Sequence, residues 1–406
     1  MLAAAAPIAS PDGDRVARRN VLVLAIAQAL AGGTSTIFIT TGGITGAMLA
    51  ADKGLATLPI TFMVVGMWLG TLPIGALAKT YGRRFALEAG SAMGILGGLI
   101  SSWAVLQGSF TLYLIGSFFA GIYGASYQSY RFAAADTASD SFRPKAVSWV
   151  LAGGIFSAII GPQLIIFTKD LLPPYLFAAT YFGQAILALA GAAVLAFVKI
   201  PPPAAEKSGA GGGRPLSEIV RNPRFMSAAV CGAASYGMMN LVMTSAPLAM
   251  LACNHSVTDA TLGLQWHVLA MFVPSFFTGS LIARFGIDRV VIAGLTLLCA
   301  SAAVAISGIA LWQFWTALVL LGVGWNFAFI GATAMVTQCH RPAERNKVQA
   351  FNDFLVFGSM AVGSFSSGQL LASFGWTAVN EVVFPVVAVA GALLFWRGMQ
   401  GRRHAV

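Results

Sequence analysis

Charged side chains are scarce in this sequence. Asp, Glu, Lys and Arg together form 9% of the 406 residues, whereas they form about a quarter of an average soluble domain. Hydrophobic residues make up 57% of the chain, and the mean hydropathy is +0.79. This composition excludes an ordinary soluble protein and predicts a chain that crosses a membrane several times.

Residue patterns for nucleotide binding, catalysis and metal binding are also missing. The chain has no Gly-x-x-x-x-Gly-Lys-[Ser/Thr] loop, so ATP is not an energy source within it. Its four cysteines have no metal-like spacing and fall at different predicted depths, which argues against a disulfide framework. We therefore expect no cofactor, no metal and no enzymatic activity.

What the sequence has instead is a series of long apolar runs. A membrane-spanning helix needs roughly 20 mostly apolar residues. Twelve runs meet this requirement, at residues 20–50, 56–78, 85–105, 109–133, 146–168, 174–198, 224–252, 259–283, 288–307, 311–336, 347–373 and 376–396.

The basic residues predict how these runs are oriented. If the N-terminus lies in the cytoplasm, all but two of the 24 Lys and Arg residues fall at or near the cytoplasmic face, and only Lys53 and Lys169 lie outside. Cytoplasmic loops of membrane proteins carry such an excess, so we expect both termini in the cytoplasm. The net charge of +10 is then explained by topology and gives no reason to expect a nucleic-acid partner.

Short motifs recur about half a chain length apart. The stretch Gly75-Ala-Leu-Ala-Lys-Thr-Tyr-Gly-Arg-Arg84 has a second version that runs from Gly279 to Arg289 with the same Gly-x-Leu-x-x-x-x-Gly frame. Ala-Met-Leu-Ala at 47–50 returns at 249–252, and Arg-Pro at 143–144 returns at 341–342. Three matches in the same order predict two homologous halves, which is typical of secondary transporters.

The first of these motifs resembles the loop between the second and third helices of the major facilitator superfamily. Gly75, Leu77, Gly82, Arg83 and Arg84 match the family pattern, whereas Lys79 stands where the family has an acid. The resemblance implies an all-α integral membrane fold of twelve transmembrane helices, arranged as two pseudo-symmetric six-helix bundles.

On this basis we predict five regions. They are a cytoplasmic tail at 1–19, a six-helix bundle at 20–199, a Pro- and Gly-rich cytoplasmic linker at 200–223, a second bundle at 224–396 and a cytoplasmic tail at 397–406. The apolar N-terminus is a poor signal peptide because its charges follow the apolar stretch instead of preceding it. We expect a multi-pass protein of the plasma membrane, the bacterial inner membrane, that works as a monomer in the lipid bilayer.

Polar and aromatic side chains in four of the runs predict a substrate site. In the family, helices 1, 4, 7 and 10 line a central cavity, which implies that the substrate site lies near the bilayer midplane. The alternative for each side chain is hydrogen bonding or packing between helices. The candidates are Gln28, Thr34 and Ser35 on the first run, Tyr123, Tyr127 and Arg131 on the fourth, Tyr236 and Asn240 on the seventh, and Trp325 and Asn326 on the tenth.

A second group of candidates is ionisable. The resemblance implies a gating cluster made of Gly75, Lys79, Gly82, Arg83, Arg84, Arg131 and Asp353, in which Asp353 would pair with Lys79 or Arg131 and latch the cytoplasmic side. A static pair that holds the halves together is the alternative. His267 and Asp353 are also candidate proton sites, although a simple hydrogen-bonding role would equally explain His267.

The candidate cavity is rich in aromatic and amide groups but poor in charge. It therefore suits a neutral or weakly anionic planar molecule, and we expect a secondary active or facilitative carrier that works by alternating access. Uptake of a riboflavin-like vitamin is our candidate activity. Proton-coupled efflux of a drug or metabolite is the first alternative, and a non-transporting membrane receptor is the second.

Overall fold

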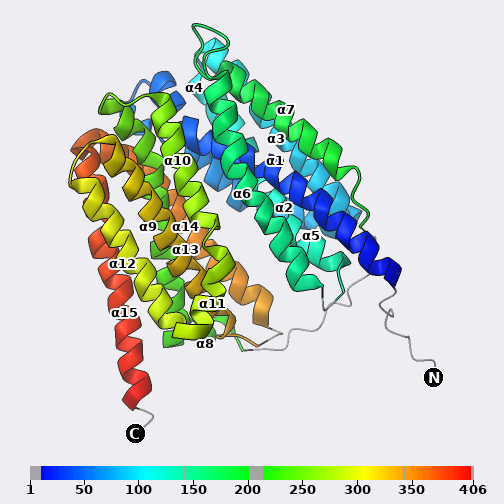
Figure 1. Ribbon diagram of the computed structural model, residues 1–406, viewed down its shortest axis with the longest axis vertical. Coiled ribbons are helices and arrows are strands. Elements are labelled where there is room, and N and C mark those ends of the chain that lie inside the picture. The colour runs from blue at the N-terminus through cyan, green and yellow to red at the C-terminus, as the bar shows by residue number, and fades with distance from the viewer. Residues whose placement is uncertain (1–10, 140–141, 201–213, 342–343, 404–406) are drawn as a thin grey trace. The chain divides into compact units, whose positions relative to one another are not determined.

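The computed structural model of the protein consists of helices joined by turns and short loops, with no strand in the part that it describes (Figure 1), which comprises residues 11–139, 142–200, 214–341 and 344–403. Within these ranges, nine helical segments are long and apolar enough to cross a membrane, and a tenth is obtained if two helices that meet at a bend of 43° count as one span. One of the nine, residues 347–399, contains two helices in succession.

The helices follow the predicted runs closely. Each of the twelve predicted spans corresponds to a helix or to a broken helix. The long helices are α1 (Pro11–Leu49), α2 (Leu58–Tyr81), α3 (Arg83–Gln107), α4 (Phe110–Gln128), α6 (Arg143–Thr168), α7 (Ala178–Leu195), α9 (Pro223–Ala252), α10 (Val257–Phe272), α11 (Ser275–Phe285), α12 (Ile287–Ile306), α13 (Leu311–Thr337), α14 (Arg345–Glu381) and α15 (Val383–Arg403). Short helices complete the set: η1 (Lys53–Leu55), α5 (Tyr130–Thr137) and α8 (Leu216–Val220).

Breaks inside the spans have identifiable local causes. Pro274 separates α10 from α11, and a proline in a helix lacks the backbone N–H and kinks the chain. Gly375 interrupts α14 with φ +79°, a left-handed conformation that favours glycine. The ends of the helices also differ from the predicted borders, because α1 begins at Pro11, inside the predicted tail, and α15 runs on to Arg403.

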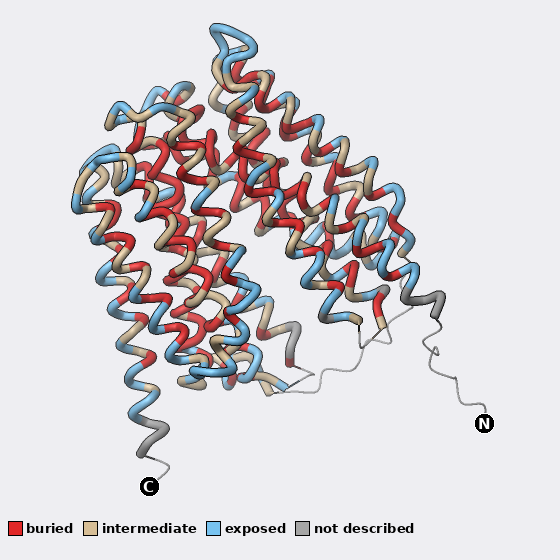
Figure 2. Tube along the Cα trace, in the orientation of Figure 1, coloured by how far each residue is buried: buried red, intermediate tan, exposed pale blue. Residues whose placement is uncertain are grey.

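The chain forms two compact units. Unit 1 contains the chain up to Ile37, Gly66–Leu106 and the segment from Ile115 to the linker. Unit 2 contains Phe38–Val65, Gln107–Leu114 and the chain from the linker onwards. Figure 2 shows buried residues on the inward faces of the helices in each unit and exposed residues on the outward faces. The units do not coincide with the two halves of the sequence, since two segments of the first half pack with the second half in unit 2.

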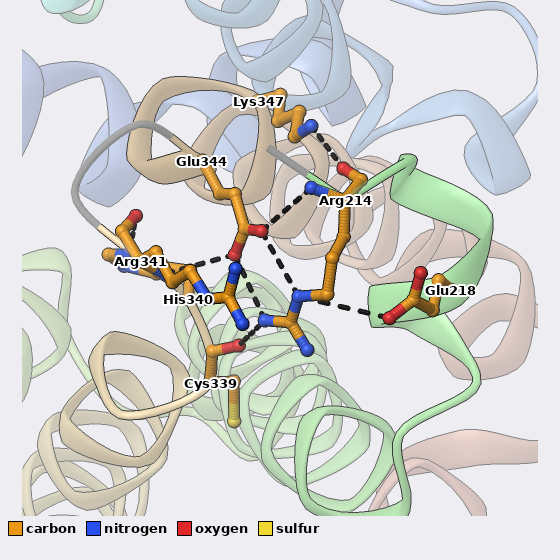
Figure 3. A network of polar contacts seen from close by, with 7 residues as sticks. All are labelled: Arg214, Glu218, Cys339, His340, Arg341, Glu344 and Lys347. Atoms are coloured by element: carbon orange, nitrogen blue, oxygen red, sulfur yellow. Dashed lines mark hydrogen bonds and ion pairs between the residues drawn. The ribbon is translucent and has the colours of Figure 1, made fainter. Parts of the chain in front are cut away.

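A charged network fixes the end of the linker within unit 2 (Figure 3). The Arg214 guanidinium donates to both carboxylate oxygens of Glu344, at 3.0 and 2.9 Å, and the backbone N–H of Arg214 donates to the same carboxylate at 2.8 Å. Lys347 donates to the Arg214 carbonyl, and the Arg341 N–H donates to Glu344. The Arg214 guanidinium and the backbone N–H groups of Arg341 and Arg214 all donate to the ionised Glu344 carboxyl. They therefore hold the pKa of Glu344 well below its usual range.

Asn326 braces the bend between α10 and α11. Its amide nitrogen donates to the carbonyl of Met271 at 2.7 Å and lies 2.7 Å from the hydroxyl oxygen of Ser275, while its amide oxygen accepts from the Thr278 hydroxyl at 2.6 Å. Asn326 lies on α13 and is fully buried. It therefore supplies hydrogen bonds at the place where Pro274 interrupts the helical pattern.

We predict that Asn326→Leu destabilises the protein by about 1–3 kcal/mol, because the change leaves buried polar groups at the bend without partners. The measurement is the thermal unfolding temperature of the purified protein in detergent. Thr296→Val is the matched control, since the exposed Thr296 hydroxyl donates to the Ile292 carbonyl of its own helix. Unfolding of Asn326→Leu at the wild-type temperature would contradict the brace.

Candidate functional site

Unit 1 groups the two predicted tyrosines, Tyr123 and Tyr127, with a third, Tyr130, around the end of α4. The Tyr127 hydroxyl donates to the Ser35 hydroxyl on α1 at 3.0 Å. The rings of Tyr123 and Tyr130 each meet the Tyr127 ring edge to face, with centroids 6.0 and 6.5 Å away. Tyr127 is half-buried, whereas Tyr123 and Tyr130 are fully buried. Of the three, Tyr127 is therefore the one with surface left for a ligand.

Tyr123 packs closely against glycines of two neighbouring helices. A side chain at Gly94 on α3 would meet its ring at 2.4 Å, and one at Gly191 on α7 would meet its hydroxyl at 3.0 Å. The ring thus fills a space between three helices that two glycines leave open. This is the packing alternative that the sequence left open, and substrate binding by Tyr123 stays a prediction.

The remaining unit 1 candidates lie on α1 and α5. Gln28 is half-buried and lies near Gly153 of α6, where an added Cβ would come within 3.1 Å of the Gln28 Cβ. The buried Thr34 hydroxyl donates to the carbonyl of Ala31 in its own helix at 2.6 Å. The guanidinium of Arg131 lies 4.8 Å from the centre of the Phe132 ring. None of these contacts decides whether the three residues bind substrate.

Unit 2 contains an aromatic cluster made of Tyr236 on α9 with Trp325 and Phe329 on α13. Trp325 and Phe329 are stacked, with ring centroids 5.2 Å apart and planes 14° apart. The Tyr236 ring stands edge to face against both, at 5.1 and 4.8 Å. The sequence singled out Tyr236 and Trp325 but missed Phe329, although its position four residues after Trp325 places it on the same face of the helix.

The indole N–H of Trp325 is a buried polar group of this cluster that lacks a partner among the described residues, as the Thr244 hydroxyl and the Nε2 atom of His267 also do in unit 2. Trp325 is 7% exposed, and its Nε1 is buried without a hydrogen-bond acceptor among the described residues. By contrast, Trp315 on the same helix donates its indole N–H to the carbonyl of Asp259 at 3.1 Å. A buried donor without an acceptor is costly, so a ligand that brings an acceptor would gain by binding here.

The side-chain amides of the two predicted asparagines form hydrogen bonds with neighbouring helices. Asn240 on α9 donates to the carbonyl of Met360 on α14 at 2.8 Å and is buried. Asn326 braces the α10–α11 bend, as described above. Both residues therefore make the interhelical hydrogen bonds that were the alternative, and substrate binding by either of them stays a prediction.

His267 joins α10 to α13. Its Nδ1 lies 2.7 Å from the carbonyl oxygen of Leu318, and the residue is fully buried. Its Nε2 has no hydrogen-bond partner among the described residues. The contact with Leu318 matches the simple hydrogen-bonding role, and a proton-carrying role stays a prediction.

The predicted gating motif forms a tight turn between α2 and α3. Gly82 is the only residue between the two helices and has φ +91°, so glycine is favoured there. Arg83 then pairs with Asp136 of α5 at 2.7 Å. Sequence reasoning missed Asp136 as a partner, although it is an acid close to the end of the fourth predicted span.

Other members of the motif lie on the surface of their unit. Arg84 pairs with Glu88 one turn later at 2.8 Å, in an exposed contact. Gly75 and Lys79 are exposed on the last turns of α2. Asp353 is exposed on α14, and its predicted pairing with Lys79 or Arg131 stays a prediction.

Unit 2 also has a cavity of about 850 Å³ between α9, α14 and α15. Its lining is mostly apolar, with Ser359, Ser366 and Gln369 as polar members. The Ser359 hydroxyl donates to its own helix, and the Gln369 amide donates to the Gly54 carbonyl. The predicted substrate residues do not line this cavity, which therefore gives no support to a site for a polar ligand.

Comparisons with known proteins assign the chain to a family. The profile of the Major Facilitator Superfamily matches residues 24–264 and 228–404. The riboflavin transporter RfnT of Brucella anthropi is 47% identical over 378 residues, which cover 92% of this chain and 94% of that protein. The uncharacterized MFS-type transporter YddS of Bacillus subtilis is 28% identical and covers 97% of this chain and 94% of its own length.

Solved structures agree on the fold. A crystal structure of a mutant of the nucleoside transporter NupG aligns with a TM-score of 0.73 at 14% identity, over 93% of this chain and 98% of that one. An auto-inhibited peptide transporter of the POT family aligns with a TM-score of 0.68 at 13% identity, over 95% of this chain and 97% of that one. Together with the helical spans, these matches show that the chain belongs to the major facilitator superfamily and is a membrane transporter with the fold predicted from its sequence.

Proposed function

We propose that this transporter carries riboflavin, or a closely related flavin, into the cell. The first support is the identity of 47% with a protein that is named a riboflavin transporter. The second support is the aromatic cluster of Tyr236, Trp325 and Phe329 in unit 2. Alternating access between the two sides of the membrane is the mechanism that the family membership implies.

The cluster suits the chemistry of a flavin. The isoalloxazine ring is planar, carries no net charge at neutral pH and presents carbonyl oxygens and ring nitrogens as hydrogen-bond acceptors. Aromatic faces hold such rings by offset or edge-to-face stacking, and a few placed polar groups set their orientation. The observation that carries the proposal is the buried indole N–H of Trp325, which has no acceptor in the described part of the chain and lies next to the stacked ring of Phe329.

Sidedness and direction belong to the same proposal. The excess of Lys and Arg in the predicted cytoplasmic loops supports both termini in the cytoplasm. A bacterial inner membrane and a monomer are the setting that we propose. Efflux of a drug-like compound is the competing function, and a receptor that binds without transport is the other. Riboflavin counterflow in proteoliposomes separates a riboflavin carrier from a receptor, because a receptor does not exchange its ligand.

We predict that Trp325→Phe weakens riboflavin binding by about 2- to 10-fold, because the ring is retained while one neutral hydrogen bond, worth about 0.5–1.5 kcal/mol, is lost. Trp325→Ala should weaken binding further, since it also removes the stacking surface. The measurement is equilibrium dialysis of the purified variants with riboflavin.

Trp315→Phe is the matched control for this experiment. It removes an indole N–H from the same helix, but one that already donates to Asp259, so riboflavin affinity should stay at the wild-type value. If Trp325→Phe lowers the unfolding temperature and leaves the affinity unchanged, Trp325 is a packing residue and the proposed site is wrong.

Cysteine labelling tests the proposed topology. In a variant without the four native cysteines, we expect Lys53→Cys and Lys169→Cys to react with a membrane-impermeant maleimide in intact cells. Ser208→Cys and Arg402→Cys should react only after the cells are permeabilised, because they lie in the basic segments assigned to the cytoplasm. Reaction of Ser208→Cys in intact cells would contradict the proposed sidedness.

A further inference from the structure

The cavity between α9, α14 and α15 in unit 2 has a volume of about 850 Å³ and is bounded by small residues. Ala233, Ala234 and Gly237 of α9 form one wall, and Gly363 of α14 lies against this wall. A Cβ at Gly363 would lie 2.6 Å from the Gly237 carbonyl oxygen, so the two helices meet backbone to backbone. The space beside this contact exists because the residues next to it have little or no side chain.

The cavity is open on one side. Val362 of α14 and Val389 of α15 line it, and their side chains are 66% and 59% exposed. Both residues lie near the middle of their predicted spans, because the midpoints of 347–373 and 376–396 are residues 360 and 386. The opening therefore lies near the depth of the bilayer midplane.

The composition of α15 indicates what surrounds this opening. From Val383 to Phe395 the helix has no polar or charged side chain. Phe384, Val389 and Phe395 are nevertheless exposed on its surface. A helix that is apolar on all sides and still exposed is typical of a membrane span in contact with lipid. The cavity therefore opens toward the acyl chains of the bilayer.

The walls of the cavity favour a hydrocarbon occupant. Two of the three polar lining side chains are bonded within the protein: the Ser359 hydroxyl donates to the Val356 carbonyl at 2.7 Å, and the Gln369 amide donates to the Gly54 carbonyl at 3.2 Å. Apolar cavities stay dry, and one of about 150 Å³ is large enough to hold benzene or xenon. If this cavity were empty, its walls would lose dispersion contacts. A flexible hydrocarbon chain supplies these contacts without needing a hydrogen-bond partner.

We propose that this cavity is a lipid-binding site that holds an acyl chain of a membrane phospholipid. The hydrophobic effect does not drive this binding, because a lipid tail leaves an equally apolar environment, so packing contacts decide it. In the cavity the chain contacts three helices, whereas on a convex helix face it is contacted from one side. The chain therefore stays longer in the cavity than on the open surface of the protein. This site is independent of the proposed substrate.

Photo-cross-linking in phosphatidylcholine vesicles tests the site. A small fraction of the lipid carries a diazirine in one acyl chain, and mass spectrometry maps the adducts after illumination. We expect a several-fold higher adduct yield at Val362 and Val389 than at Ile186 and Leu189 of α7. These two reference residues are aliphatic, lie near the middle of the predicted span 174–198 and are 52% and 58% exposed. Because depth and exposure are similar, an excess at the cavity reports a bound chain.

Filling the cavity is the second arm of the experiment. Ala233→Phe places a ring at the wall of the cavity and should lower the adduct yield at Val362 and Val389 to the level found on α7. Ala388→Phe is the matched control, since Ala388 is exposed on α15 and does not line the cavity, and it should leave both yields at the wild-type value. The unfolding temperature of each variant shows whether it is folded. Val386→Phe fills the same space from α15 if Ala233→Phe does not fold.

Three outcomes would overturn the lipid site. Equal adduct yields at the cavity and on α7 would make the cavity an ordinary part of the lipid-facing surface. An unchanged yield at the cavity in a folded, filled variant would place the labelled chain outside the cavity. Labelling of α7 without labelling of the cavity would mean that another occupant covers it, such as a second copy of this chain. None of these measurements uses riboflavin, so a failure of the proposed substrate leaves the test intact.

Discussion

This structure depends on one constraint: polar groups inside the hydrocarbon core of the membrane need hydrogen-bond partners. Water is not available to satisfy a polar group at that depth, so each group needs a partner within the protein. Asn240, Asn326 and the Nδ1 atom of His267 follow this rule by bonding to backbone carbonyls of neighbouring helices. The indole N–H of Trp325, the Thr244 hydroxyl and the Nε2 atom of His267 lack a partner among the described residues. Of these, the indole N–H of Trp325 belongs to an aromatic cluster, which is a physical reason to look for a ligand there.

The number and order of the helices could be predicted from the sequence because hydrophobic length alone decides whether a segment can span a bilayer. The interruptions were harder to predict, although Pro274 and Gly375 are the kinds of residue that cause them. The predicted borders also missed the early start of α1, because the amphiphilic residues from Pro11 onwards do not lengthen the apolar run. Hydropathy identifies the membrane-embedded part of a helix but does not show how far the helix extends beyond the bilayer.

Partners across the fold were the least predictable part of the candidate site. Helical spacing placed Tyr236 and Asn240 near each other on α9, but it could not tell that Tyr236 meets Trp325 while Asn240 bonds to Met360. Asp136 was likewise missed as the partner of Arg83. These contacts depend on which helices are neighbours in space, and a single sequence carries no direct record of that. The same limit explains why the grouping of Phe38–Val65 with the second half was not foreseen.

Family membership fixes the scaffold and leaves the choice of substrate to a few side chains. A nucleoside transporter with 14% identity shares the fold at a TM-score of 0.73, so the arrangement of helices tolerates almost complete replacement of the sequence. Substrate choice is therefore a matter of groups such as the aromatic cluster, where one ring or one N–H changes what can bind.

The brace at Asn326 also has a consequence for biosynthesis. Its partners at Met271 and Thr278 are made 55 and 48 residues earlier than Asn326 itself. At a synthesis rate of about 5–20 residues per second, this is a delay of roughly 3–10 seconds. During this interval the bend at Pro274 has been synthesised while its supporting amide does not yet exist. The hydrogen bonds from Asn326 to Met271 and Thr278 can therefore form only after α13 has been made, which places the brace late in folding.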